Sequence, residues 1–187
     1  MPYLKEAMKN LAKSYYEEQV WLKNKYSPTM DEYMLAATVS SGTTMSIVFA
    51  LAGLGDVVTK MTFDWILSKP KMITACEVVT RLQDDIVSHE FEQDREHPPS
   101  AVECYMSQHG VSESEACKVL SKMVADGWKD MNTGCIKPTA APIQVLERIL
   151  NFARLIDVVY KDGDGFTHTK EFLDDVVSSL LIDPVDI

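Results

Sequence analysis

Apolar residues recur at three- and four-residue intervals along almost the whole chain, which is the period of amphipathic helices. Gly and Pro residues separate the periodic segments. Thr29 with Glu32, and Ser112 with Glu115, have the spacing of a capping box at a helix start. The pattern predicts helices over residues 3–25, 31–41, 45–54, 56–67, 71–96, 100–109, 112–132, 142–160 and 170–181. The sequence shows no sustained two-residue alternation, which would mark strands, so we expect an all-α fold.

Length and charge narrow the class of protein. A chain of 187 residues has the size of one domain. Its net charge of −10 argues against a nucleic-acid partner. The longest apolar run, residues 45–54, is interrupted by Ser46 and Gly53 and is shorter than the ~20 residues of a membrane span. We therefore expect no membrane span.

The four cysteines stand far apart in the sequence, at Cys76, Cys104, Cys117 and Cys135. None forms a CxxC pair, which argues against a zinc site. Their apolar helical surroundings predict reduced core thiols in a reducing compartment, and disulfide pairing stays open as the alternative.

The segment 81–95 carries the pattern with the clearest chemistry. Asp84, Ser88 and Glu92 follow one another at four-residue steps, so their oxygens share one helix face, and Asp85 is expected to point elsewhere. Arg81 lies one turn before them and Arg95 just beyond. Oxygen ligands bracketed by arginines fit Mg²⁺, which shares its coordination shell with waters and substrate phosphate.

The alternative is a solvated acidic face whose carboxylates pair with the arginines. Two observations weigh against it. The apolar residues Val79, Leu82, Ile86 and Phe91 are expected to bury the other faces of this helix. Ser88 has only a modest helix propensity, and a solvent-facing helix position gives no reason for a serine there.

The run Asp-Asp-Ile-Val-Ser-His-Glu-Phe-Glu at residues 84–92 resembles the second metal-binding motif of plant class I terpene synthases. Residues 21–33, 101–106, 128–132, 151–154 and 164–168 are similar to stretches of the angiosperm sesquiterpene synthases, in the same order. This resemblance covers essentially the whole chain. It implies the C-terminal part of a class I terpenoid-synthase helical barrel, with residues 1–187 as its metal-binding catalytic domain.

The resemblance also implies roles for individual residues. Mg²⁺, or Mn²⁺ in its place, would bind Asp84, Ser88 and Glu92, and the substrate diphosphate would contact Arg81 and Arg95. The loop 160–166 would close over the pocket, with Tyr160 and Asp164 as catalytic residues. Phe166 departs from the family, where a Tyr is usual.

The activity that the resemblance implies is that of a lyase. Such an enzyme ionises farnesyl diphosphate, or a related prenyl diphosphate, and cyclises the cation to a sesquiterpene. We also expect a cytoplasmic monomer that binds no nucleic acid.

Two segments have a second interpretation. Residues 160–171 approach a calcium-binding EF-hand loop, with Asp162, Asp164 and Glu171 at ligand positions and Tyr160 where a carboxylate is needed. The break at residues 40–44 either turns backbone carbonyls toward the carbocation, as the resemblance implies, or is a packing Gly between two helices.

One part of the family pattern is missing from this sequence. The family needs an Asp-Asp-x-x-Asp cluster, but the pairs at 84–85 and 174–175 are followed three residues later by Ser88 and Ser178. We therefore expect the domain to be incomplete at its N-terminal side and this chain alone to be inactive. The main alternative is a non-catalytic helical fragment with residual affinity for metal or diphosphate.

Overall fold

The computed structural model describes residues 2–184, and within that range the chain forms helices and no strand, which confirms the all-α prediction. The α-helices are α1 (Pro2–Asn24), α2 (Met30–Ser40), α3 (Thr43–Leu51), α4 (Lys60–Leu67), α5 (Lys71–Glu92), α6 (Ala101–His109), α7 (Glu113–Gly134), α8 (Ile143–Val159), α9 (Thr169–Phe172) and α10 (Asp174–Leu181). A 3₁₀ turn, η1 (Gly55–Val57), precedes α4.

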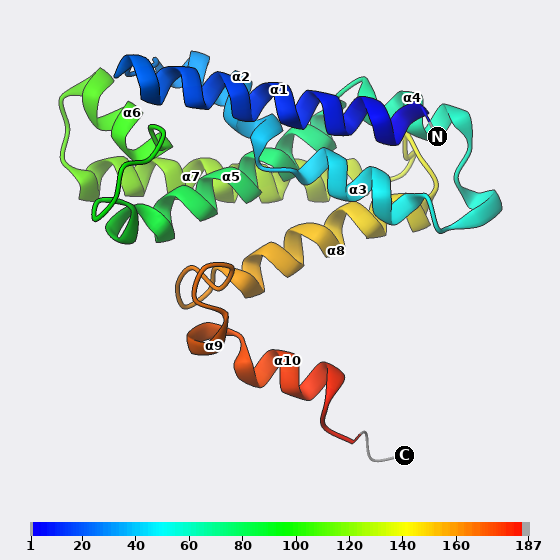
Figure 1. The fold of residues 1–187 in the computed structure, drawn as a ribbon. Helices are drawn as coiled ribbons and strands as arrows, with labels where there is room; N and C mark the ends of the chain where they lie inside the picture. Colours follow the sequence, from blue (N-terminus) through cyan, green and yellow to red (C-terminus); the bar gives the residue numbers. More distant parts are fainter. Residues whose placement is uncertain (1, 185–187) are drawn as a thin grey trace.

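The long helices α5 and α7 lie side by side at the centre of the bundle (Figure 1). Helices α2, α3 and α8 pack against α5, and α1 packs against α2 and α3, while α9 and α10 lie beyond the C-terminal end of α8. The central pair approaches closely because α7 has a glycine there. A Cβ atom on Gly127 would lie 2.9 Å from Val79 Cγ2 and 3.2 Å from the Ala75 carbonyl oxygen.

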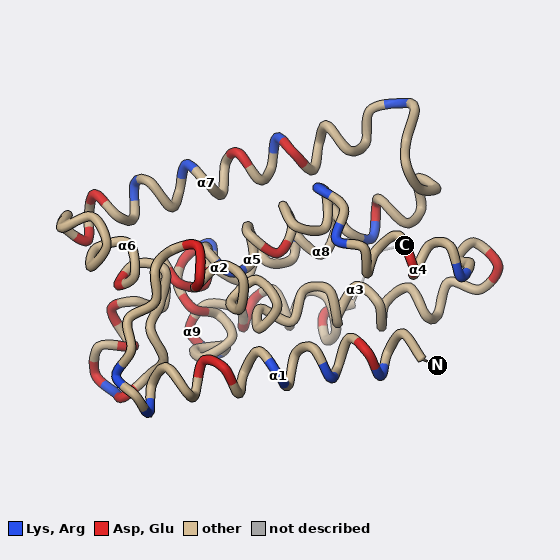
Figure 2. Tube along the Cα trace, turned by 90° about the horizontal axis from the view of Figure 1, so that it is seen from above, with Lys and Arg blue, Asp and Glu red and all other residues tan. Residues whose placement is uncertain are grey.

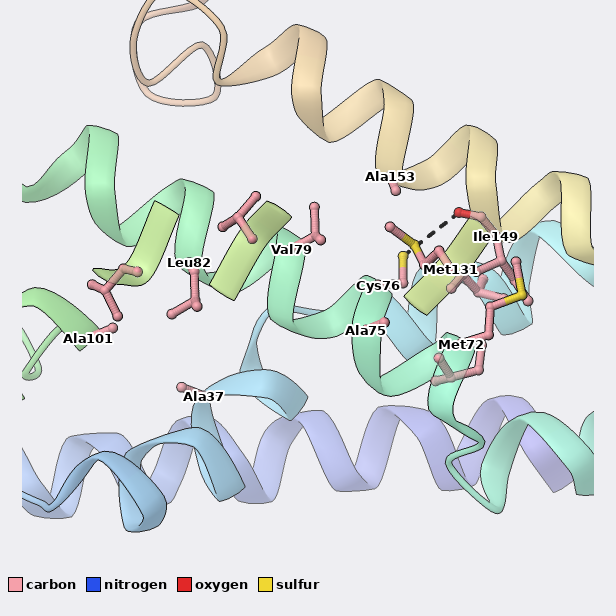
Figure 3. Close-up of a cluster of buried hydrophobic side chains, with 14 of the residues drawn as sticks. Ala37, Met72, Ala75, Cys76, Val79, Leu82, Ala101, Met131, Ile149 and Ala153 are labelled. Carbon is pink, nitrogen blue, oxygen red and sulfur yellow. Dashed lines mark hydrogen bonds between the residues drawn. The ribbon is translucent and has the colours of Figure 1, made fainter. Parts of the chain in front are cut away.

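The hydrophobic core is built around α5 (Figure 3). Cys76, Val79 and Leu82 on this helix are fully buried, as are Met131 on α7 and Ile149 on α8. Burying an aliphatic side chain of this size stabilises a fold by about 1.5–3 kcal/mol. Charged side chains are spaced along α1 and α7, at opposite sides of the view in Figure 2. This division between apolar and charged faces is the one that the sequence pattern predicts.

The predicted capping boxes are confirmed at Thr29–Glu32 and Ser112–Glu115. A third box, which the sequence analysis did not identify, starts α6. There the Ser100 hydroxyl accepts the Glu103 N–H at 3.4 Å, and the Glu103 carboxylate accepts the Ser100 N–H at 2.9 Å. This box fixes the turn that follows the acidic segment of α5.

Some helix boundaries and burial predictions were wrong. The segment predicted at 56–67 divides into η1 and α4, the last helix divides into α9 and α10, and α5 ends at Glu92 before residue 96. Helix α3 is not buried all round, because Phe49 is 49% exposed while Ile47 and Val48 are buried. Phe91 on α5 is likewise 42% exposed.

The stretch Met30–Leu51 is long and apolar enough to cross a membrane by length and composition alone, with a mean hydropathy of 1.5. In the structure it is two helices, α2 and α3, separated at Gly42, which has a φ of 71°. Half of the apolar window is buried inside the protein. Core helices pass the same composition test, so the stretch is weak evidence for a membrane span.

Candidate metal centre

A polar pocket of about 230 Å³ lies at the C-terminal end of α5. It is lined by Glu18, Tyr33, Arg81, Asp84, Asp85, Glu92, Pro98, Pro99 and Ser100. Arg81, Asp84 and Glu92, which the sequence analysis singled out, therefore face one pocket. They do so because they are spaced three, then eight, residues apart on one helix.

Ser88 lies between Asp84 and Glu92 on α5 and is buried. Within residues 2–184, no three His, Cys, Asp or Glu side chains gather as metal ligands. Ser88 is not among the residues that line the pocket, so the structure places two of the three predicted ligands, Asp84 and Glu92, in it. The ligand roles of Asp84, Ser88 and Glu92 stay predictions.

Asp85 does not point away from the site, as the sequence analysis predicted, but lines the same pocket. Its carboxylate accepts the Tyr33 hydroxyl at 2.5 Å and the Ala101 backbone N–H at 2.9 Å, and it pairs with Arg81 Nη2 at 3.0 Å. These contacts join α2, α5 and the first turn of α6. The prediction was wrong because it considered only the helix on which Asp85 lies, whereas the acceptor is held by donors from two neighbouring helices.

Arg81 is the one cation among the residues that line this pocket. It pairs with Asp84 as well as Asp85. Burial alone would lower the pKa of the Arg81 guanidinium, but the neighbouring charges, with Asp85 foremost, outweigh burial and raise it. Arg81 Nε is buried without a hydrogen-bond partner in the described residues. The guanidinium thus keeps one N–H for an acceptor that the protein does not supply.

The other acids of the pocket are held in an environment that disfavours their charge. Burial raises the pKa of Glu92, against the opposing effect of His97. Burial also raises the pKa of Glu18, although the Ser40 hydroxyl donates a hydrogen bond to it. An excess of buried acid over base is the electrostatic setting that a bound cation would relieve.

Arg95 lies outside the pocket lining and is 61% exposed. One of its guanidinium nitrogens is 4.0 Å from Glu92 Oε1. His97 stands closer to the same carboxylate, with Nδ1 at 3.8 Å from Glu92 Oε2. The predicted contact between Arg95 and a diphosphate therefore has no support from this geometry and stays a prediction.

The loop between α8 and α9 packs against the same end of α5. The rings of Phe91 and His168 lie 4.7 Å apart, and Val87 packs against Tyr160 and its apolar neighbours. Burial raises the pKa of Tyr160, whose hydroxyl lies within electrostatic reach of Arg81 and Glu92. The loop is thus placed beside the candidate metal centre, as a closing segment would need to be.

Asp164 is buried and organises this loop. Its Oδ1 accepts the backbone N–H groups of Phe166 at 3.1 Å and Thr167 at 3.0 Å. Phe166 packs edge-on against Tyr160, with ring centroids 5.7 Å apart. The catalytic roles of Tyr160 and Asp164 stay predictions, and the structure adds a positional role for the aspartate.

The EF-hand interpretation of this loop finds no support. Asp162 and Glu171 are exposed, whereas Asp164 is buried and bonds its own backbone. No acidic cluster suited to a metal gathers within residues 2–184.

A second polar cluster lies at the break between α2 and α3, and sequence reasoning missed it. Glu77 is 1% exposed and accepts hydrogen bonds from Lys69 Nζ at 2.5 Å and the Thr44 hydroxyl at 2.7 Å. Burial raises the pKa of Glu77 despite both donors. A carboxylate between the core positions Cys76 and Val79 was the signal that could have revealed it.

The residues of the pocket fit Mg²⁺. The predicted ligands that line it are carboxylates, whose oxygens hard divalent cations prefer, and they are partly open to solvent, with Asp84 27% and Glu92 22% exposed. When bound, Mg²⁺ would neutralise negative charge on a leaving diphosphate.

Comparison with known proteins gives the family. Residues 1–130 match the metal binding domain of the terpene synthase family. Sesquiterpene synthase 2 of Toona sinensis and (−)-germacrene D synthase of Vitis vinifera are each 53% identical over 185 residues, which is 99% of this chain. The chain spans about a third, 33%, of the length of both relatives.

Among solved structures, the chain resembles isoprene synthase from grey poplar leaves (Populus x canescens) in complex with three Mg²⁺ ions and dimethylallyl-S-thiolodiphosphate. The TM-score is 0.85 at 25% identity, over 99% of this chain and 35% of that one. The helical fold of the class I synthases is thereby confirmed. On the match to its metal binding domain and the identity to these relatives, the chain belongs to the terpene synthase family.

Proposed function

We propose that this protein supplies the metal-binding part of a sesquiterpene synthase, which uses Mg²⁺ to ionise farnesyl diphosphate and cyclise the resulting cation. The observation that carries the proposal is the meeting of Arg81, Asp84 and Glu92 in one pocket beside the α8–α9 loop. The names of the two relatives at 53% identity support a farnesyl substrate over shorter prenyl diphosphates. Mn²⁺ would take the place of Mg²⁺ at the same oxygen ligands.

Each residue has a distinct task in this proposal. Asp84, Ser88 and Glu92 hold the cation, and Arg81 offers N–H donors to the diphosphate oxygens. The aromatic pair Tyr160–Phe166 shields the substrate from water and presents ring faces that attract a carbocation. Metal and arginine together stabilise the leaving anion without a proton transfer.

We further propose that the 187-residue chain binds metal and diphosphate without turnover. Neither Asp-Asp pair in the sequence continues to a third Asp, so one of the two acidic clusters that the family uses is missing from these residues. The non-catalytic alternative is therefore the state we expect of this chain alone. Turnover needs a second acidic cluster to complete the charge around the diphosphate.

A cytoplasmic monomer completes the proposal. The four cysteines are free thiols, which suits a reducing compartment. Size-exclusion chromatography with light scattering tests the monomer, and a fluorescent fusion expressed in plant cells tests the location.

Calorimetric titration of the purified chain tests the binding function. Mg²⁺ alone should bind weakly, because this ion relies on phosphate oxygens for much of its shell, and inorganic pyrophosphate should bind more tightly with Mg²⁺ than without it. Ser88→Ala and Glu92→Gln should each weaken the Mg²⁺-dependent part. Glu90→Gln is the matched control, since Glu90 is an exposed acid on the same helix.

Two outcomes would contradict the proposal. One is tight Mg²⁺ binding that does not need pyrophosphate. The other is Mg²⁺-dependent pyrophosphate binding that neither substitution changes. Detection of a cyclic sesquiterpene by mass spectrometry, from the chain with farnesyl diphosphate and Mg²⁺, would refute the claim that it does not turn over.

A further inference from the structure

Arg81 has two acidic partners that are held in different ways. Asp85 is 3% exposed, and it is fixed by the Tyr33 hydroxyl and the Ala101 N–H as well as by Arg81. The side chain of Asp84 is 27% exposed, and it pairs with Arg81 from the neighbouring position on α5. One partner is therefore built into the junction of three helices, whereas the other is partly exposed and pairs with Arg81.

We propose that Asp85 is a positioning residue that keeps Arg81 in place, while Asp84 exchanges between Arg81 and the metal. Metal binding at Asp84 then releases the guanidinium toward the diphosphate. This inference rests on the proposed function, because it takes Asp84 as a ligand and diphosphate as the anion. It goes beyond that function by linking the two binding events through one ion pair.

The charges of the pocket support the exchange. Four carboxylates, those of Glu18, Asp84, Asp85 and Glu92, line the pocket with a single guanidinium. An anion that approaches Arg81 is repelled by these acids and competes with Asp84 for the same N–H donors. Once Asp84 binds a cation, the repulsion decreases and the competition for the N–H donors of Arg81 ends. Metal and anion therefore each raise the affinity for the other.

Asp85 has to remain on Arg81 for this release to be productive. With Asp84 withdrawn, the pair between Arg81 Nη2 and Asp85, at 3.0 Å, still holds the guanidinium at the pocket. The Tyr33 and Ala101 donors hold the carboxylate that makes this pair. Arg81 Nε is buried and has no partner in the described residues, so the guanidinium keeps one donor that neither carboxylate occupies.

Pyrophosphate binding without metal separates the exchange from simple metal bridging. If the cation only bridges protein and anion, losing a carboxylate helps metal-free anion binding only through reduced repulsion, to a similar extent at Asp84 and at Glu92. If Asp84 competes for Arg81, Asp84→Asn tightens metal-free pyrophosphate binding. We expect a gain of about tenfold or more, which corresponds to about 1.4 kcal/mol.

The controls test whether the gain comes from the loss of a negative charge alone. Glu92→Gln deletes one negative charge from the pocket at a residue that pairs with Arg95 and His97 instead, and it should change metal-free binding by less than about threefold, or ~0.6 kcal/mol. Asp85→Asn deletes one charge beside the same guanidinium but loses the tether, so it should give no gain. In an Arg81→Gln background, the gain from Asp84→Asn should vanish.

Calorimetry with inorganic pyrophosphate, with and without Mg²⁺, decides the matter. Circular dichroism establishes that each variant is folded. Should Asp85→Asn or Arg81→Gln fail to fold, the comparison of Asp84→Asn with Glu92→Gln decides alone, since both side chains are partly exposed.

A metal-free gain in Asp84→Asn that exceeds the change in Glu92→Gln, together with loss of the Mg²⁺ enhancement, supports the exchange. Equal changes in metal-free affinity in the two variants, or no gain in Asp84→Asn, overturn the exchange. In that case Mg²⁺-dependent pyrophosphate binding by the wild type would still support the proposed function. If neither the wild type nor any variant binds pyrophosphate, with or without Mg²⁺, both the exchange and the proposed function are overturned.

Discussion

Replacing Tyr33 by Phe should destabilise the protein, although the new side chain fills nearly the same volume. Tyr33 is 2% exposed, and its hydroxyl donates to Asp85 Oδ2 at 2.5 Å. Both burial and the Asp85 charge raise the pKa of this hydroxyl, so it remains a neutral donor throughout the working pH range. The substitution removes one donor from a buried carboxylate and changes little else.

The size of the loss in stability depends on the hydrogen bonds that Asp85 retains in the Tyr33→Phe variant. The Arg81 and Ala101 donors still contact the carboxylate, so it is not left unpaired. A hydrogen bond to a charged group contributes about 1.5–3 kcal/mol, so we expect the free energy of unfolding to fall by about 2 kcal/mol. For a domain of this size each kcal/mol lowers Tm by about 2–4 °C, which gives a decrease of about 4–8 °C.

Thermal unfolding followed by circular dichroism measures this decrease, and urea unfolding gives the free energy directly. Tyr15→Phe is the matched control, because Tyr15 is 50% exposed on α1 and should change Tm by about 1–2 °C at most. A Tyr33→Phe variant as stable as the Tyr15→Phe control would refute the view that Asp85 joins α2, α5 and α6 through this hydroxyl.

Three further predictions concern other parts of the molecule. Glu77→Gln should gain stability relative to wild type as pH rises above ~4.5. The pKa of Glu77 is raised in the folded state, so its contribution to wild-type stability is fully present below the unfolded-state pKa and is lost as pH rises through the folded-state pKa. Parallel urea titrations between pH 4 and 8 check this, and a difference in unfolding free energy that stays constant with pH would count against it. Asp164→Ala should speed hydrogen exchange at the amides of Phe166 and Thr167, measured by NMR, and unchanged rates would show that the carboxylate does not hold the loop. Glu171→Gln should leave Ca²⁺ affinity unchanged in calorimetry, because Glu171 is exposed and lies in no acidic cluster, and a micromolar site lost on substitution would restore the EF-hand interpretation.

Sequence periodicity was enough for the fold class and for most helices, because apolar residues of this chain face the core at helical spacing. Periodicity failed where tertiary contacts determine the end of a helix or the burial of a side chain. The end of α3 and the division of the last helix at Leu173 depend on what lies beside them, and Phe91 is exposed although its position fits an apolar face. Burial of a residue is a property of its neighbours, which one helix does not reveal.

In the candidate site, too, the sequence predicts the features that lie along one helix and misses those that depend on neighbouring helices. The face of α5 that carries Asp84 and Glu92 follows from their spacing, and the pocket lining agrees with it. The place of Asp85 does not follow from spacing, because its donors come from residues that are 52 and 16 positions away in the sequence. The cluster of Glu77 with Lys69 and Thr44 was missed for the same reason, since Thr44 is 33 positions away.

Helix α5 serves as core element and site at once, and the two uses are coupled. Cys76, Val79 and Leu82 fix its position against α7 and α8, while the roughly opposite face of the helix holds more acids than bases in a partly open pocket. The raised pKa values of Glu18 and Glu92 show that the folded state disfavours their charged forms. The apolar faces of α5 offset this electrostatic cost, because they hold the carboxylates together against their mutual repulsion. A cation that binds there relieves the repulsion in the folded state alone, so Mg²⁺ with pyrophosphate should stabilise the chain by the linkage that any native-state ligand follows. In the function that we propose, the features that make the pocket unfavourable by itself would therefore be the ones that make it selective for a metal bound together with an anion.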